Sequence, residues 1–135
     1  MRSVGKALPV SPVLLVRRHA TPPPSHTLRV QVLIIGGQGA TGGSLASTEV
    51  FDPVTGVFSR AATMFSARHT HSATLLSSGK VLVAGGAVFS DVATVLCEVY
   101  DPATNTFSGT GPLLSPRKEH SAVLLPNGQV CVKCG

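Results

Sequence analysis

Alternating apolar and polar residues mark a hairpin in the middle of the chain. His71 to Leu76 is one β-rich run, Lys80 to Ala84 is a second, and Ser77-Ser78-Gly79 lies between them. Serine and glycine between two such runs favour an antiparallel hairpin. Gly85-Gly86 ends the second run, because glycine tolerates a positive φ or a close backbone approach that other residues resist. This stretch therefore predicts two paired strands followed by a break.

A similar sequence recurs at an interval of 49 residues. Residues 120–135 repeat residues 71–86, and residues 32–37 repeat the second half of the hairpin. An ungapped alignment of residues 32–86 with residues 81–135 gives 22 identities in 55 pairs. A period of this length indicates a repeat protein in which each copy is one supersecondary unit.

Each repeat is expected to form four short strands. In the complete copy they cover residues 71–76, 80–84, 94–100 and 106–109. Turn sequences separate the strands: Asp52 and Asp101 each precede a proline, and their carboxylates can accept hydrogen bonds from backbone N–H groups farther along the turn. Four strands in about 50 residues, with no helical periodicity, predict an all-β fold.

The repeated glycines and aromatics resemble the kelch motif. Glycine pairs follow four apolar residues at Gly36-Gly37 and Gly85-Gly86. Two aromatics seven residues apart follow each pair, although phenylalanine stands where that family usually has tryptophan at the second aromatic position. The resemblance covers residues 32–135. It implies a β-propeller made of four-stranded antiparallel blades, with residues 71–76 as an innermost strand.

A second repeated motif has the sequence Arg-x-x-His-Ser-Ala-x-Leu-Leu. It contains Arg68 and His71 in one copy and Arg117 and His120 in the next. This text is most similar to bacterial kelch-type proteins, including relatives of the galactose oxidase propeller. Recurrence favours structural roles: hydrogen bonds across the inner hairpin for the histidines, and bridges between blades or positions facing the axis for the arginines. Glu49 and Glu98 are expected to pair with such arginines or with backbone groups rather than to act as catalytic acids. A metal role for the histidines and a ligand role for the arginines are the alternatives.

The chain holds fewer repeats than a propeller needs. One full unit covers residues 71–109, three strands precede it in residues 32–60, and two follow it in residues 120–134. Propellers have about 4–8 blades, and repeat proteins need about three copies to cover their apolar faces. We therefore expect a truncated kelch chain that cannot close a ring alone. Its open blade faces favour self-association.

Charge and proline content divide the chain into a leader and a repeat region. The leader, residues 1–31, contains five basic residues and no acidic one, and its prolines and lack of acids predict disorder. The repeat region, residues 32–135, contains one repeat at 32–80, a second at 81–129 and the start of a third at 130–135. The repeat region has six basic and six acidic residues, so the net charge of +5 belongs to the leader.

The neutral repeat region argues against a nucleic-acid surface, since it has one tyrosine, no tryptophan and no basic stripe. No apolar run reaches the roughly 20 residues of a membrane helix. The three cysteines make no disulfide framework, and Cys131 and Cys134 form a lone C-x-x-C that is best explained by chance, because a zinc site needs about four ligands. Unpaired thiols slightly favour the cytoplasm. The basic, apolar start weakly resembles an export signal, which leaves an exported protein as the alternative.

The predicted function is a non-catalytic binding or scaffold module without a cofactor. Loops between strands carry binding in propellers, which selects Gln38 and Thr41 in one loop and Ser90 and Asp91 in the next. The partner would be a protein, another copy of the chain or a carbohydrate. The alternatives are a fragment of a secreted enzyme similar to galactose oxidase and a chain with no independent function. That enzyme type uses copper with two tyrosines, two histidines and a cysteine linked to one tyrosine, whereas this chain has only Tyr100.

Overall fold

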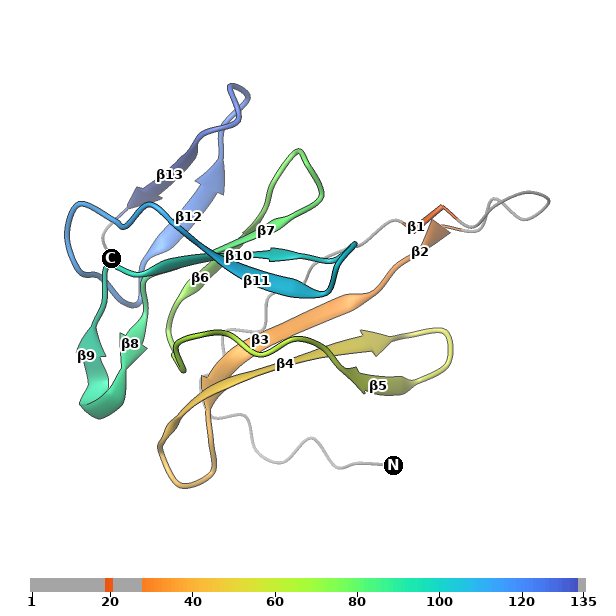
Figure 1. Cartoon of the computed structure of the whole chain (residues 1–135), viewed down its shortest axis with the longest axis horizontal. Helices are drawn as coiled ribbons and strands as arrows, with labels where there is room; N and C mark the ends of the chain where they lie inside the picture. Colours follow the sequence, from red (N-terminus) through yellow and green to blue (C-terminus); the bar gives the residue numbers. More distant parts are fainter. Residues whose placement is uncertain (1–18, 21–27, 134–135) are drawn as a thin grey trace.

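The computed structural model describes residues 19–20 and 28–133, which form antiparallel sheets (Figure 1). Three consecutive sheets carry the repeat. The first sheet contains β3 (Val32–Gln38), β4 (Ser44–Asp52) and β5 (Val57–Arg60). The second sheet contains β6 (Ser72–Leu75), β7 (Val81–Ala84), β10 (Cys97–Asp101) and β11 (Thr106–Thr110). The third sheet contains β12 (Ser121–Leu124) and β13 (Val130–Lys133).

The second sheet is the complete four-stranded unit that the sequence predicts. Its strands lie in the order β11-β10-β7-β6, and every neighbouring pair is antiparallel. The predicted central hairpin is confirmed, with Ser72 opposite Ala84 and Leu75 opposite Val81. The third strand begins at Cys97, later than expected, because the Leu96 N–H turns to the Thr94 hydroxyl at 3.1 Å and bends the chain there.

The predicted turn chemistry is present in both repeats. The carboxylate of Asp52 accepts a 2.9 Å hydrogen bond from the backbone N–H two residues ahead, and Asp101 does the same at 2.9 Å. Each turn then places one residue in the left-handed region, Gly56 at φ 69° and Asn105 at φ 53°. Glycine and asparagine accept this conformation at low cost, which explains why they occupy the two equivalent positions.

The strand counts of the three sheets confirm the expected incomplete series. The first, second and third sheets have three, four and two strands, and across residues 28–133 they do not close a ring. All three sheets are antiparallel, as an all-β fold of blades requires. In the described part of the chain, no helix is long and apolar enough to span a membrane.

Two small hairpins lie outside these three sheets. The segment between β7 and β10, expected to be a loop, forms β8 (Ala87–Val88), the 3-10 turn η1 (Phe89–Asp91) and β9 (Val92–Ala93). In the leader, β1 (His19–Ala20) pairs with β2 (Leu28–Arg29), so these residues depart from the expected disorder. Leader residues 1–18 and 21–27, and Cys134 of the C-x-x-C, lie outside the described residues, so the expectations for them stay predictions.

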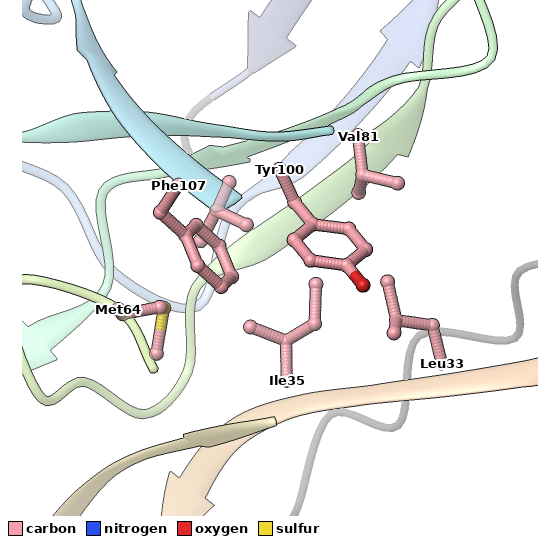
Figure 2. Close-up of a cluster of buried hydrophobic side chains, with 7 residues drawn as sticks. Leu33, Ile35, Met64, Val81, Tyr100 and Phe107 are labelled. Carbon is pink, nitrogen blue, oxygen red and sulfur yellow. The ribbon is translucent and has the colours of Figure 1, made fainter. Parts of the chain in front are cut away.

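The core lies between the first and second sheets (Figure 2). Alternation along each strand sends every second side chain to the same face, so each sheet contributes one apolar face. The buried members of this core are Leu33, Ile35, Met64, Val81, Val83, Tyr100 and Phe107. Burying one such side chain is worth about 1.5–3 kcal/mol, so contact between sheets is the main source of stability in this fold.

Candidate functional site

The repeated glycines lie where the end of one sheet contacts the segment that leads into the next sheet. Gly85 has φ 60°, and a Cβ at this position would lie 2.6 Å from the carbonyl oxygen of Arg117 and 2.9 Å from Cε1 of His120. One repeat earlier, Gly36 has φ 60° and meets the Arg68 carbonyl at 2.7 Å. Only glycine fits such contacts, so these positions serve the packing of sheets.

Arg68 joins the first sheet to the second, as the sequence predicts. Its backbone belongs to the first sheet: its N–H donates to the Leu45 carbonyl at 3.0 Å, and its carbonyl accepts from Gly37 N–H at 2.9 Å. Its fully buried side chain belongs to the second sheet, where it donates to the Leu96 carbonyl at 2.7 Å and to the Glu98 carboxylate at 2.8 Å.

Glu98 has both carboxylate oxygens occupied. Besides Arg68, the carboxylate accepts backbone N–H groups of Phe65 at 2.8 Å and Ser66 at 3.2 Å. A buried ion pair is tolerated when hydrogen bonds satisfy its remaining polar atoms. The expected pairing of this glutamate with an arginine and with backbone groups is confirmed, and the carboxylate has a structural position.

Arg117 repeats the bridge between the second and third sheets. Its carbonyl accepts from Gly86 N–H at 2.9 Å, and its guanidinium donates to the Val132 carbonyl at 3.2 Å and to the Ser115 hydroxyl at 2.9 Å. Both repeated arginines therefore connect neighbouring sheets through a backbone contact on one side and a side-chain contact on the other.

The repeated histidines face the preceding sheet, so the expected hydrogen bonds across their own hairpin are wrong. The ring of His120 lies 2.8 Å from the Ser72 hydroxyl in the second sheet. The buried His71 ring lies against Gly36, whose missing side chain leaves the space that the ring fills. Burial and, to a smaller extent, the Arg68 charge lower the pKa of His71 to about 4, against the opposing effect of a hydrogen bond with the backbone of Ile35. Burial also lowers the pKa of His120, with the Arg117 charge acting in the same direction.

Two loops expected to bind a partner meet at His69. The first loop ends at Ser44, whose hydroxyl oxygen lies 2.9 Å from Nδ1 of His69. The other ring nitrogen of His69, Nε2, lies 3.3 Å from the carboxylate of Asp91 in the second loop. The backbone strengthens this junction, because His69 and Ala87 exchange hydrogen bonds of 3.0 and 2.8 Å. The structure thus brings the two loops together through a residue that belongs to neither.

Lys118 completes the junction from the segment before the third sheet. Its ammonium group donates to the Asp91 carboxylate and, at 3.2 Å, to the Asp91 carbonyl. The hydrogen bond from Lys118 lowers the pKa of Asp91, and His69 acts in the same direction. Ser44, His69 and Asp91 form a row of hydroxyl, imidazole and carboxylate, an order that can activate a nucleophile. Lys118 also binds this carboxylate, so four side chains from separate segments meet at the junction.

The second loop presents apolar side chains at its tip. Phe89 is 88% exposed, and Val92 on the other side of the turn is also exposed. Between them Ser90 and Asp91 adopt left-handed conformations, with φ 56° and 60°. A non-glycine residue in this region is uncommon and is held there by its surroundings, which here are the contacts of Asp91.

The first loop is closed by hydrogen bonds among its own residues: Gly39 N–H donates to the Gly43 carbonyl at 2.7 Å, and Gly42 N–H donates to the Gly39 carbonyl at 2.9 Å. Gln38 donates from its side-chain amide to the Gly42 carbonyl at 2.9 Å, and Thr41 is exposed at the turn. The sequence pattern selects Gln38 and Thr41 but not His69 and Lys118, which hold the second loop. His69 and Lys118 occupy equivalent positions in successive repeats. The residue type differs at this position, whereas the position before it is arginine in both repeats. A variable position beside an invariant one is the signal that could have identified them.

The described residues do not fit a copper centre of the galactose oxidase type. Tyr100, the single tyrosine, stacks on Phe107 with ring centroids 5.0 Å apart, and its hydroxyl donates to Asn105 at 3.0 Å. Cys97 is buried on the same strand, and its thiol donates to the Val95 carbonyl at 3.6 Å. Across residues 28–133, no group of three or more His, Cys, Asp or Glu side chains could hold a metal ion.

Comparison with known proteins agrees with the repeat geometry. The kelch motif matches residues 23–65, beginning inside the leader and covering the whole first sheet. A solved structure of a fungal alcohol oxidase from the AA5 family, in complex with copper, superimposes with a TM-score of 0.63 at 24% identity. The match covers 74% of this chain and 23% of the oxidase, so the chain spans about a quarter of that protein. No curated protein sequence matches. The chain carries the kelch motif, and its sheets have the fold of β-propeller blades.

Proposed function

We propose that the chain is a non-catalytic binding module whose loop face recognises a protein. The observation that carries this proposal is Phe89, which is 88% exposed on a turn that Asp91 fixes through His69 and Lys118. Aromatic side chains dominate the energy of protein interfaces, and a loop held in advance loses little conformational entropy on binding. An exposed phenylalanine on an anchored loop combines both properties.

Charge supports a protein partner over a nucleic acid. The charges nearest the tip are Asp91 and Lys118, which neutralise each other. An apolar tip with neutral surroundings fits an apolar pocket on another protein. Protein surfaces that bind nucleic acids are instead strongly basic.

The proposal is tested with a photo-crosslinking amino acid placed at position 89 of the full chain. Val54, exposed in the turn between β4 and β5, is the matched control position. In an extract of the native cells, position 89 should capture a discrete protein that position 54 does not. The purified partner should then bind Phe89→Ala about thirtyfold more weakly than the original chain, a loss typical of an aromatic hot spot.

Two results would contradict this function. If the captured protein binds Phe89→Ala and the original chain equally well, the tip is not the contact. If a glycan array instead gives binding that depends on Phe89 while no protein is captured, the ligand is a carbohydrate.

The second candidate is a piece of an oxidase, favoured by the structural similarity to the copper-containing fungal alcohol oxidase. Calorimetric titration of the full chain with Cu²⁺ distinguishes the two candidates. The binding module should give no stoichiometric copper site, because its tyrosine is occupied in the packing between sheets. A single tight site that Tyr100→Phe abolishes would favour the oxidase.

A further inference from the structure

Three segments of the chain meet at one end of the second sheet. Ser72 at the start of β6 lies opposite Ala84 at the end of β7, and Ala84 also lies opposite Cys97 at the start of β10. Thr110, the last residue of β11, lies opposite Cys97. The segments that lead into β6, join β7 to β10 and leave β11 therefore share this end, the loop face, from which β8 and β9 project (Figure 1). They cover residues 61–71, 85–96 and 111–120.

The most exposed apolar side chains gather on the loop face. Of the large apolar side chains in residues 30–133, four are more than three-quarters exposed. Phe65, Phe89 and Leu114 are three of them, one from each segment of the loop face. The fourth, Val54, lies in the turn between β4 and β5. Single exposed apolar residues are ordinary, whereas a group on one face marks an interaction site.

Phe65 and Leu114 occupy the same position in successive repeats, 49 residues apart. Each precedes a serine, and the backbone N–H of the residue before each donates a 2.9 Å hydrogen bond in both repeats. An apolar residue at a repeated position is expected in the core, but both of these side chains face solvent. The repeat therefore carries an apolar residue here without burying it, which indicates a contact outside the chain.

The exposure of Phe65 is a property of the segment between two sheets. The backbone N–H of Met64 donates to the Ala46 carbonyl in the first sheet at 2.9 Å. The backbone N–H of Phe65 donates to the Glu98 carboxylate in the second sheet at 2.8 Å. Although both sheets hold the segment, the Phe65 side chain is 76% exposed. An aromatic side chain on a backbone fixed in advance loses little conformational entropy on binding.

The loop that carries Phe89 is tied to both of the other segments. On one side, His69 exchanges backbone hydrogen bonds of 3.0 and 2.8 Å with Ala87. On the other side, the Lys118 ammonium pairs with the Asp91 carboxylate. Because Ala87 and Asp91 flank Phe89 in the sequence, the tip is held between the segment of residues 61–71 and that of residues 111–120.

Charge and turn composition select the kind of partner. Protein surfaces that bind lipid use basic groups beside apolar ones, but the Lys118 ammonium is already neutralised by Asp91. The turns at the opposite end of the second sheet, residues 77–79 and 102–105, are rich in serine, glycine, threonine and asparagine. Another copy of the chain therefore offers little apolar surface to the loop face from that end. A different protein with an uncharged apolar surface fits both observations.

We propose that Phe65, Phe89 and Leu114 bind one protein partner together, through an uncharged apolar surface that receives all three side chains. This inference rests on the proposed binding function and extends its contact from the tip at Phe89 to all three segments of the loop face. Phe65 is the second main anchor, because aromatic residues dominate interface energies. Leu114 contributes less, since leucine is under-represented among the residues that dominate them.

Photo-crosslinking at four positions of the full chain tests the shared contact. The crosslinking amino acid is placed singly at positions 65, 89, 114 and 54 and irradiated in an extract of the native cells. Positions 65, 89 and 114 should capture the same protein, and position 54 should not. Mass spectrometry should place the three crosslinks at separate apolar residues on one surface of that protein.

Affinities measured with the purified partner complete the test. Phe65→Ala should weaken binding about tenfold and Leu114→Ala about threefold, as expected for a major and a minor apolar contact. Val54→Ala is the matched control and should bind like the original chain. Circular dichroism should show the same β signal in all variants, because each substituted side chain is exposed.

The alternative outcomes separate this inference from the proposed function. Capture at position 89 alone, with Phe65→Ala binding as tightly as the original chain, overturns the shared contact and leaves the proposed function standing. Capture at no position overturns both. Capture at positions 65 and 114 without position 89 also overturns both, because the tip then takes no part. Sedimentation of the chain with phosphatidylcholine vesicles that Phe65→Ala abolishes would make the occupant a lipid surface and overturn the protein partner.

Discussion

The backbone N–H of Gly86 donates a 2.9 Å hydrogen bond to the carbonyl oxygen of Arg117 in the segment before the next sheet. The same contact occurs one repeat earlier, between Gly37 and Arg68, also at 2.9 Å. A glycine pair at the end of one sheet and an arginine before the next are therefore two halves of a single joint. This joint explains why both residues recur in the sequence at the same interval.

The joint predicts a large effect of Gly85→Ala on stability. A methyl group there would lie 2.6 Å from the Arg117 carbonyl at a positive φ, so steric overlap adds to backbone strain. We expect the free energy of unfolding to fall by about 3 kcal/mol. Urea denaturation followed by circular dichroism measures the loss.

Gly79→Ala is the matched control for this substitution. Gly79 has φ 82°, but a Cβ there would meet nothing within 4 Å, so only the backbone strain remains. The expected loss is about 1 kcal/mol. Equal losses in the two variants would mean that the close approach of the sheets contributes nothing.

A second prediction concerns the buried pair of Arg68 and Glu98. Glu98→Ala leaves a fully buried guanidinium without its carboxylate and frees the N–H groups of Phe65 and Ser66. Removing one partner of a buried pair costs about 3–5 kcal/mol. The urea midpoint should fall accordingly, and the double variant Arg68→Met, Glu98→Leu should recover much of the loss.

The exposed pair of Lys80 and Asp101 is the control for the buried one. Its atoms are 3.1 Å apart, but solvent screens the charges. Lys80→Ala should leave the urea midpoint almost unchanged. A loss as large as that of Glu98→Ala would show that burial does not determine the strength of these pairs.

The repeat made much of the fold predictable from sequence. Turn residues such as Asp52 and Asn105 act on their own neighbours in the chain, so local chemistry determines their geometry. The pairing of Arg68 with Glu98 was also predictable, because both residues occupy repeated positions and carry opposite charges that attract each other. The turns depend on one repeat at a time, whereas the ion pair joins neighbouring sheets through two charged residues that the repeat itself marks.

Features that depend on contacts between sheets were less predictable. The direction of His71 follows from the space beside Gly36 in the preceding sheet, which no periodicity within one repeat reveals. The loop junction at His69 joins three separate segments of the chain through Ser44, Asp91 and Lys118. Asp91 was predictable as a loop residue, whereas its partners required the spatial arrangement of the sheets.

A third prediction concerns the anchoring of the second loop. Asp91→Asn removes the charge that binds Lys118 and His69, and Lys118→Ala removes its main partner. We expect amide hydrogen exchange in β8 and β9 to accelerate several-fold in both variants, because the loop then opens locally. The global urea midpoint should stay the same, since Asp91 itself is exposed and solvent screens its charge. Unchanged exchange in both variants would mean that the backbone alone holds the loop.

The last prediction is a dependence of stability on pH that arises from His71. Its pKa is about 4 in the folded chain against an ordinary value of 6.5, so the unfolded chain binds more protons between these values. Stability contributed by the neutral ring is therefore complete above pH 6.5 and is lost as the pH falls toward 4. The loss from pH 7 to pH 4 should reach about 3 kcal/mol.

His71→Gln isolates this contribution, because glutamine does not titrate. Urea denaturation at pH 4, 5, 6 and 7 should give a shallower slope for the variant than for the original chain, although the variant is less stable at pH 7. Acidic groups such as Asp91 and Asp101 also lose stabilisation as the pH falls, since their pKa values are lowered in the folded chain. Those groups titrate in both proteins, so the difference between the two slopes belongs to His71. Parallel slopes would contradict the burial of a neutral imidazole between the sheets.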